Sequence, residues 1–505
     1  MTTRADSPGP AIREAGDPST SVWAALRSPR RLRTEVLAGL VVALALIPEA
    51  ISFSIIAGVD PRVGLFASFT MAVTIAFVGG RPAMISAATG AVALVIAPLV
   101  RQHGVDYFIA TVILAGIMQI ALSLFGVARL MRFIPRSVMV GFVNALAVLI
   151  FMSQLPHLLG VPGLVYPFVG VGLLIMVLLP KLTTAVPAPL VAILLLTAVA
   201  VVFGVDVPTV ADQGELPSSL PSLFFPHVPL TLATLSIIAP YALAMALVGL
   251  LESLMTAKLV DDITDTHSDK TREGWGQGVA NVVTGFFGGM GGCAMIGQTM
   301  INVKVSGART RISTFLAGVF LLVLVVGLGD IVGLIPMAAL VAVMIMVSFA
   351  TMDWHSIAPA TLRRMPRSET TVMAATVVVT VVSHNLAAGV IVGSLTAMVL
   401  FARRVSHMVT VQRIEKSDSV VYLVSGELFF ASSNDLFYQF DYLGDPPTVV
   451  IDLTGAHIWD ASTVAALDAV TTKYRAKGKC AEIVGLNQDS AERHDRLSGQ
   501  FGADH

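Results

Sequence analysis

Charged residues and cysteines are scarce in this 505-residue chain. Only 13% of its residues are charged, against about 25% in a typical soluble domain, and 55% are hydrophobic. This composition excludes an ordinary soluble protein. The formal net charge is −1, so there is no basic field to hold nucleic acid. Two cysteines, Cys293 and Cys480, are too few for a disulfide framework and too far apart for a CxxC metal motif.

Sequence motifs of ATP-driven and hydrolytic chemistry are also missing. No phosphate-binding P-loop, GxSxG nucleophile elbow or HExxH zinc motif occurs in the chain. We therefore expect no enzyme, no cofactor and no metal site, and an ATP-driven pump is disfavoured.

What is present is an uneven distribution of charge, which divides the chain into three zones. Residues 1–35 carry ten charges among Ser, Pro, Gly and Thr and predict a cytoplasmic N-terminal tail. Residues 36–404 carry 33 charges in 369 positions, which predicts a membrane domain. Residues 405–505 carry 22 charges in 101 positions and predict a domain in water.

Apolar runs bounded by Gly, Pro or charge predict an all-α polytopic membrane domain with fourteen spans. The third and tenth runs are interrupted by Gly- and Pro-rich segments, so we expect half-helices there. The runs lie at 36–57, 63–78, 84–100, 107–126, 137–155, 165–180, 188–204, 235–257, 275–289, 294–303, 312–328, 331–350, 370–384 and 386–402.

Basic residues predict the orientation of these spans. With the N-terminus in the cytoplasm, sixteen of the eighteen Lys and Arg residues of the middle zone, Arg129 and Arg132 among them, fall in cytoplasmic loops or at span ends. Only Arg62 and Arg101 fall outside. This bias predicts an inner-membrane protein whose N-terminus and C-terminal domain are cytoplasmic.

An internal repeat is visible in the membrane zone. The segment Phe-Val-Gly-Gly at 77–80, followed by Ala-Met-Ile-Ser at 83–86, recurs as Phe-Phe-Gly-Gly at 286–289, followed by Ala-Met-Ile-Gly at 294–297. The two halves begin seven spans apart. Since seven is odd, the second copy must be inverted relative to the first, which is the 7+7 design of secondary transporters.

The two half-helices predict an anion site. Interrupted spans are tolerated in a membrane where protein or water forms hydrogen bonds with the free backbone groups. We therefore expect the segments 79–86 and 288–292 to line a cavity. Helix N-termini meeting at the midplane would offer N–H groups and positive dipole ends to an anion. The alternative is that small residues there only permit tight helix packing. The candidate binding residues are Ser86, Ala87, Ala88 and Thr89 in the first copy and Met295, Ile296, Gly297 and Gln298 in the second.

Two acidic residues, Glu49 and Glu252, lie deep within predicted spans. An ionised carboxylate in a bilayer costs at least about 2.5 kcal/mol, so each should be protonated, paired or hydrated. Both are candidates for binding a coupling ion, H⁺ or Na⁺. The alternative is a neutral acid hydrogen-bonded to a backbone carbonyl. The aspartates at 261, 262, 265 and 269 lack EF-hand spacing and predict only a solvated cytoplasmic loop.

Several segments resemble one known family. Residues 48–53 (PEAISF) with 56–65 (IAGVDPRVGL) resemble the opening signature of the sulfate permease (SulP) family, bacterial relatives of the animal anion exchangers that include prestin. Residues 250–257 (LLESLMTA) and 276–281 (GQGVAN) resemble its eighth and ninth span motifs. With the C-terminal zone, the resemblance covers nearly the whole chain.

The resemblance implies a core domain that moves against a gate domain, commonly in a homodimer, with a small inorganic or organic anion and membrane lipid as partners. It implies an anion site around Ala87, Ala88 and 295–298, with Glu252 beside it and Thr256 one turn further on. In a sodium-dependent bicarbonate branch the pair matching Glu252 and Thr256 helps to bind sodium.

Two further positions bear on the coupling ion. Glu49 matches an acid that resembles the proton-coupling group of a prokaryotic proton-driven branch. Many animal members carry Arg where this chain has Gln298. This departure disfavours chloride exchange and favours symport with a cation.

The C-terminal zone predicts a small α/β domain, because short apolar runs at 420–424 and 449–453 precede an amphipathic stretch at 462–474. The segments DLT at 452–454 and WDAS at 459–462 resemble the STAS domain of sulfate transporters and anti-sigma-factor antagonists. In the antagonists the serine matching Ser462 is phosphorylated. Here Ser462 also suits a helix N-cap, which is the favoured interpretation. Cys480 is expected to be buried in the following strand.

These observations favour a symporter of small oxyanions that works by alternating access, with sulfate, bicarbonate and dicarboxylate all open as substrates. A sodium-coupled bicarbonate symporter is one alternative. A nucleobase permease would share the inverted repeat but leave the STAS-like domain unexplained. A membrane-anchored signalling scaffold would not require matched broken spans with buried acids.

Overall fold

The computed structural model describes residues 20–126, 134–182, 188–229, 231–406 and 409–499. Residues 1–19 of the predicted tail lie outside this part of the chain, and so do Arg129 and Arg132. The chain divides into two compact units, residues 1–393 and 394–505, and each is described by itself.

Helices overlap all fourteen predicted runs, although the third and tenth runs begin in short strands, and this mostly helical unit confirms the predicted fold class. Seven helices are long and apolar enough to cross a membrane, and three shorter apolar helices accompany them in the described residues. The helices of the first unit are α1 (Val22–Leu26), α2 (Pro29–Ala57), α3 (Pro61–Val78), α4 (Gly90–Leu124), α6 (Arg136–Gln154), α7 (Val165–Leu182), α8 (Ala188–Val202), α9 (Leu232–Thr264), α10 (Lys270–Phe286), α11 (Ile296–Met300), α12 (Arg311–Gly327), α13 (Gly329–Gly333), α14 (Met337–Thr351), α15 (Trp354–Ile357), α16 (Pro359–Arg364), α17 (Arg367–Ser383) and the first part of α18 (Leu386–Ser406).

Helix boundaries follow the local chemistry of Pro and Gly. Helix α2 begins with Pro29, whose missing N–H is not needed in the first turn, and ends at Gly58 in the left-handed conformation (φ +78°). Helices α1 and α2 thus begin inside the range 1–35 predicted as a tail. The third and fourth predicted spans are two helices that share the label α4, and they are separated by a kink at Gly104, where φ is +81° and ψ is −175°.

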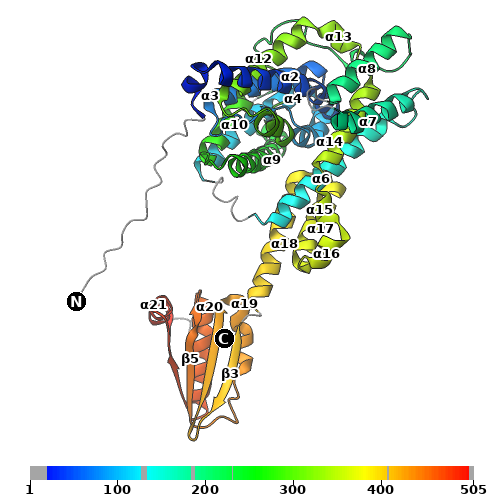
Figure 1. The fold of residues 1–505 in the computed structure, drawn as a ribbon. Helices are drawn as coiled ribbons and strands as arrows, with labels where there is room; N and C mark the ends of the chain where they lie inside the picture. The colour runs from blue at the N-terminus through cyan, green and yellow to red at the C-terminus, as the bar shows by residue number, and fades with distance from the viewer. Residues whose placement is uncertain (1–19, 127–133, 183–187, 230, 407–408, 500–505) are drawn as a thin grey trace. The chain divides into compact units, whose positions relative to one another are not determined.

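The helices of the first unit sort into two groups (Figure 1). Helices α2, α3, α4, α9, α10 and α12 pack on one another, and α6, α7, α8, α14 and α17 form a second set of neighbours. Helix α14 contacts α2, and α6 contacts α4, so the two groups meet along these elements. The division into a core that moves against a gate stays a prediction.

The second unit is an α/β domain with a four-stranded sheet of order β3-β4-β5-β6. Strands β3 and β4 are antiparallel, whereas β4, β5 and β6 are parallel. Apolar residues of β4 and β5 pack against one face of helix α20. The strands and helices are β3 (Thr410–Glu415), β4 (Ser419–Leu428), α19 (Phe430–Leu436), β5 (Thr448–Ile458), α20 (Ala461–Ala476), β6 (Cys480–Val484) and α21 (Gln488–Leu497).

Two expectations for this second unit were wrong. The N-cap of α20 is Asp460, whose side chain accepts a hydrogen bond from the Thr463 N–H, and Ser462 is an exposed residue in the first turn. Aspartate is as good an N-cap residue as serine, and Asp460 takes this role because it lies directly before the helix. Cys480 is exposed rather than buried, because it is the first residue of β6, which is an edge strand of the sheet.

Candidate functional site

The two broken spans meet at a pair of very short strands. Strand β1 (Ser86–Ala87) pairs with β2 (Cys293–Ala294) in antiparallel register, and the Met295 N–H adds a 2.9 Å bond to the Ile85 carbonyl. Equivalent segments of the two sequence copies are therefore antiparallel neighbours, as an inverted repeat requires. The pairing fixes the start of α4 beside the start of α11.

Neither half-helix has a fully satisfied N-terminus. In α4 the Thr89 side chain accepts from the Val92 N–H at 3.4 Å. In α11 the N-cap is Met295, which offers no side-chain acceptor, so the N–H groups of the first turn lack a cap. A Cβ at Gly297 would meet nothing within 4 Å. Open space thus borders the backbone where α11 begins.

A cavity of about 290 Å³ lies against both of these N-termini. Its walls come from both helix groups: α2, α4, α9 and α11 on one side, α6 and α14 on the other. The lining residues are Glu49, Phe53, Thr89, Gly90, Phe142, Val143, Leu146, Ile150, Glu252, Met295, Ile296, Gly297, Gln298, Ile301, Val347, Ala350 and Thr351.

Both predicted coupling acids line this cavity. The Glu49 carboxylate follows Pro48 within α2 and interacts with the side-chain amide of Gln298. Glu252 is 7% exposed and accepts a 2.9 Å hydrogen bond from the Cys293 thiol. No Lys or Arg is among the described residues that line the cavity. An anion held here would therefore rely on main-chain dipoles and a bound cation.

The remaining predicted residues lie behind the lining. Ser86 is fully buried, and its Oγ accepts from the Gln277 amide at 2.6 Å. Ala87 and Ala88 are buried in the strand pair and the turn that follows it. The Thr256 hydroxyl donates to the Glu252 carbonyl within its own helix at 2.8 Å, so it does not face the cavity.

The segments at 79–86 and 288–292 do not line the cavity, which corrects the expectation for them. Their backbone is satisfied by protein instead. The Asn281 side chain bonds both the N–H and the carbonyl of Gly292, at 2.8 and 3.0 Å. A Cβ at Gly292 would come within 1.8 Å of the Ala87 carbonyl oxygen, so only glycine allows the strand pair to form.

The sequence analysis did not identify two features of the site: the apolar wall of the cavity and the thiol of Cys293. Phe142, Leu146 and Ile150 on α6 and Val347 on α14 line the cavity, but in sequence they resemble any lipid-facing residues. Cys293 carried one available signal, its place between the repeated Gly-Gly and Ala-Met-Ile elements.

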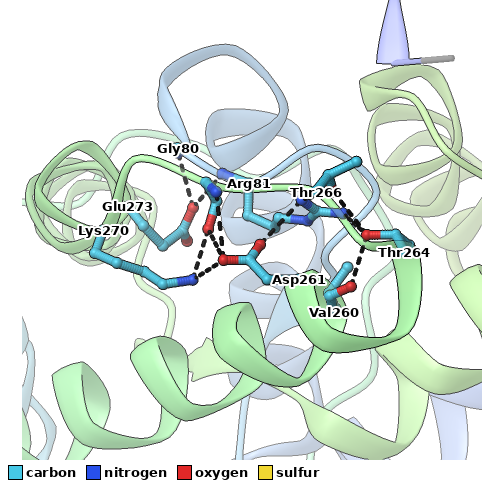
Figure 2. A network of polar contacts seen from close by, with 9 residues as sticks. Gly80, Arg81, Val260, Asp261, Thr264, Thr266, Lys270 and Glu273 are labelled. Atoms are coloured by element: carbon cyan, nitrogen blue, oxygen red, sulfur yellow. Dashed lines mark hydrogen bonds and ion pairs between the residues drawn. The ribbon is translucent and has the colours of Figure 1, made fainter. Parts of the chain in front are cut away.

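A second polar cluster lies on the same unit, away from the lining residues (Figure 2). Arg81, with its side chain 3% exposed, pairs with Asp261 at 3.0 Å, and Lys270 pairs with the same carboxylate at 2.5 Å. Glu273 accepts from the N–H groups of Gly80 and Arg81 at 2.8 and 2.9 Å. The prediction of a loop was wrong for Asp261 and Asp262, because α9 extends to Thr264. Asp261 joins the cluster, whereas Asp262 is exposed.

These features define a class. The two sequence copies pair through antiparallel strands, the helices that follow these strands begin at one cavity between two helix groups, and the carboxylates of Glu49 and Glu252 line that cavity. This is the design of a secondary membrane transporter.

Comparison with known proteins gives the family. The chain matches the sulfate permease family over residues 32–171 and 165–376 and the STAS domain over residues 410–499. It is 54% identical to the putative sulfate transporter YbaR of Bacillus subtilis, over 91% of this chain and 95% of that protein. It is 26% identical to the bicarbonate transporter BicA of Synechocystis, over 93% and 91%. This chain belongs to the sulfate permease family and carries a C-terminal STAS domain.

Solved structures agree with this assignment. The transmembrane domain of a cyanobacterial BicA superposes with a TM-score of 0.64 and 25% identity, covering 72% of this chain and 98% of that one. Murine Slc26a9 in the inward-facing state gives a TM-score of 0.80 at 16% identity, over 93% and 88%, which shows the shared fold. The protein is thus a multi-pass membrane transporter of the anion class and not an enzyme.

Proposed function

We propose that this protein is a cation-coupled symporter of small oxyanions in the inner membrane. One observation carries the proposal: the starts of both half-helices and the carboxylates of Glu49 and Glu252 line a single cavity, and none of the described lining residues is basic. Helix N-termini favour the anion, and a proton or Na⁺ at Glu49 or Glu252 supplies the missing positive charge.

The cavity lies between the two helix groups, so movement of one group against the other changes which side it opens to. For transport, substrate and cation bound together need only shift the equilibrium between the outward-open and inward-open orientations. In this proposal Ser86, Ala87, Ala88 and Thr256 support the site from behind. The N-terminus and STAS domain are cytoplasmic, and the protein acts as a homodimer.

The substrate and coupling ion are separated by one transport experiment. Purified protein in proteoliposomes is supplied with labelled sulfate, bicarbonate or a dicarboxylate under a pH gradient alone or a sodium gradient alone. We expect one oxyanion to accumulate under one gradient. Bicarbonate uptake driven by sodium would favour the alternative of a sodium-coupled bicarbonate symporter, and two relatives are named as bicarbonate transporters. Absence of gradient-driven uptake of all three anions would contradict the proposal.

Substitution of Glu49 tests its coupling role. The Glu49→Gln variant should lose proton-driven accumulation yet retain substrate binding, because the amide keeps its shape but cannot carry the proton. Glu369→Gln is the matched control, since Glu369 is exposed in the first turn of α17. Undiminished proton-driven uptake by Glu49→Gln would exclude this role for Glu49.

The STAS domain offers one regulatory position. Ser462 is exposed in the first turn of the 16-residue helix α20, where the helix dipole stabilises negative charge. A phosphate on this hydroxyl would therefore be accommodated without unfolding the domain. Mass spectrometry of protein purified from the native host, comparing Ser462 with the Ser462→Ala variant, tests this modification.

A further inference from the structure

The Cys293 thiol occupies a junction between the two repeats. Cys293 is fully buried in β2. Its Sγ lies 2.9 Å from Glu252 Oε2 and 3.1 Å from Thr89 Oγ1. Glu252 and Thr89 both line the cavity, while Cys293 lies behind them. A thiol that only filled space would not need polar neighbours at these distances.

The direction of these hydrogen bonds can be assigned. Thr89 Oγ1 already accepts from the Val92 N–H, so its own hydrogen is available to the sulfur. The thiol hydrogen then points to Glu252, because an ionised carboxylate can only accept. A series of hydrogen bonds therefore runs from Thr89 at the α4 N-terminus in the first repeat, through Cys293, to Glu252 in the second repeat.

We propose that Cys293 is a positioning residue that couples the state of Glu252 to the anion-binding N-terminus of α4. The inference rests on the proposed function and extends it to a residue outside the cavity. When a proton or a cation occupies Glu252 Oε2, it competes with the thiol for that oxygen, and the thiol hydrogen turns away from it. Thr89 then loses its fixed partner, and the first turn of α4 presents a different group to the anion.

Few other titratable groups lie near the hydrogen bonds that join Thr89, Cys293 and Glu252. Glu49 on α2 is the second carboxylate on the cavity, and its partner is Gln298 rather than Cys293. No Lys or Arg lines the cavity in the described ranges. A change confined to Cys293 therefore alters the link to Glu252 and leaves the contact of Glu49 with Gln298 in place.

Transport kinetics test this coupling. The background is Cys480→Ser, since Cys480 is exposed in the STAS domain and the protein then contains one thiol. In proteoliposomes, KM for the transported oxyanion is measured at low and high concentration of the coupling cation. Cys293→Ser retains a donor and should keep the ratio of the two KM values to within about twofold. Cys293→Ala should reduce the ratio about fivefold or more, the usual lower range of site-to-site coupling. An unchanged ratio in Cys293→Ala would overturn the proposal.

A vibrational measurement decides the same point without transport. In the Cys480→Ser protein the infrared S–H stretch reports on Cys293 alone. We expect the band to shift in Glu252→Gln and in Thr89→Val, but not in Glu369→Gln. If no oxyanion is transported, the proposed function is wrong, but the infrared band still tests the hydrogen bonds of Cys293. A band indifferent to both Glu252 and Thr89 would refute the hydrogen-bonded chain, even if Cys293→Ala failed to fold.

Discussion

Two glycines beside the cavity show how single residues divide between fold and function. Gly292 lies against the Ala87 carbonyl, whereas Gly297 faces open space at the start of α11. Gly297 ends the second copy of the repeat and Gly292 lies in the segment between its two parts, and nothing in the sequence alone separates their roles. Their surroundings predict opposite consequences for the same substitution.

Gly292→Ala should destabilise the protein. The added methyl group would force β1 and β2 apart, and overpacking of this kind typically costs about 1–3 kcal/mol. We expect a lower midpoint of thermal unfolding in detergent. Gly297→Ala is the matched variant, and it should keep the midpoint while weakening anion binding, because its methyl group enters the cavity. Equal midpoints for the two variants would contradict this account.

At the scale of elements, buried acids hold the ends of helices together. Glu35 in α2 accepts from the N–H groups of Arg309, Thr310 and Ser313, and so fixes the start of α12. Glu273 in α10 does the same for the segment that follows α3. Both carboxylates are buried, and neither was singled out in the sequence because each lies near the end of an apolar run. Their positions show that these two buried acids hold the structure together, in contrast to the coupling role proposed for Glu49 and Glu252.

Asp261 should be essential for the stability of the cluster in Figure 2. It joins Arg81, from the segment after α3, to Lys270 at the start of α10. Asp261→Asn removes the negative charge and leaves the buried Arg81 poorly compensated, which typically costs about 3–5 kcal/mol. Thermal unfolding in detergent should show a lower midpoint. Asp262→Asn provides the control, since Asp262 is the exposed neighbour, and a similar effect of both variants would count against the ion pair.

At the scale of the whole molecule, the second unit, the STAS domain, should lose stability at alkaline pH. In the STAS domain Tyr422 and Tyr474 both donate to Asp445, at 2.7 and 2.5 Å. Burial, together with the hydrogen bonds to Asp445, raises the pKa of both phenols. The folded domain therefore keeps protons that unfolded tyrosine releases near pH 10. The resulting stabilisation is complete below that pH and is lost as the pH rises towards the folded pKa values.

Pulse proteolysis of the full-length protein at increasing pH, read by mass spectrometry, measures this effect. Cleavage within residues 409–499 should increase above about pH 10. Tyr474→Phe removes one of the two phenols, so its cleavage should rise less steeply with pH. Tyr438→Phe is the control because Tyr438 is 84% exposed. The same pH profile for Tyr474→Phe and the unmodified chain would refute the assignment to Tyr474.

The sequence by itself determined the membrane domain, its broken spans, the inverted repeat and the α/β domain. These follow from local properties, since run length, Gly and Pro positions and the period of apolar residues act on the chain directly. The same reasoning identified Glu49 and Glu252, because a charge in an apolar run is conspicuous wherever the run lies.

Only the tertiary structure decided which residues share the cavity. Ser86 and Thr89 are three residues apart, yet the first bonds Gln277 and the second borders open space. The apolar wall from α6 and α14, the thiol link from Thr89 to Glu252 and the ion pairs of Arg81 all join segments distant in sequence. Such contacts depend on how helices pack, and one chain read by its local patterns carries no record of its long-range neighbours.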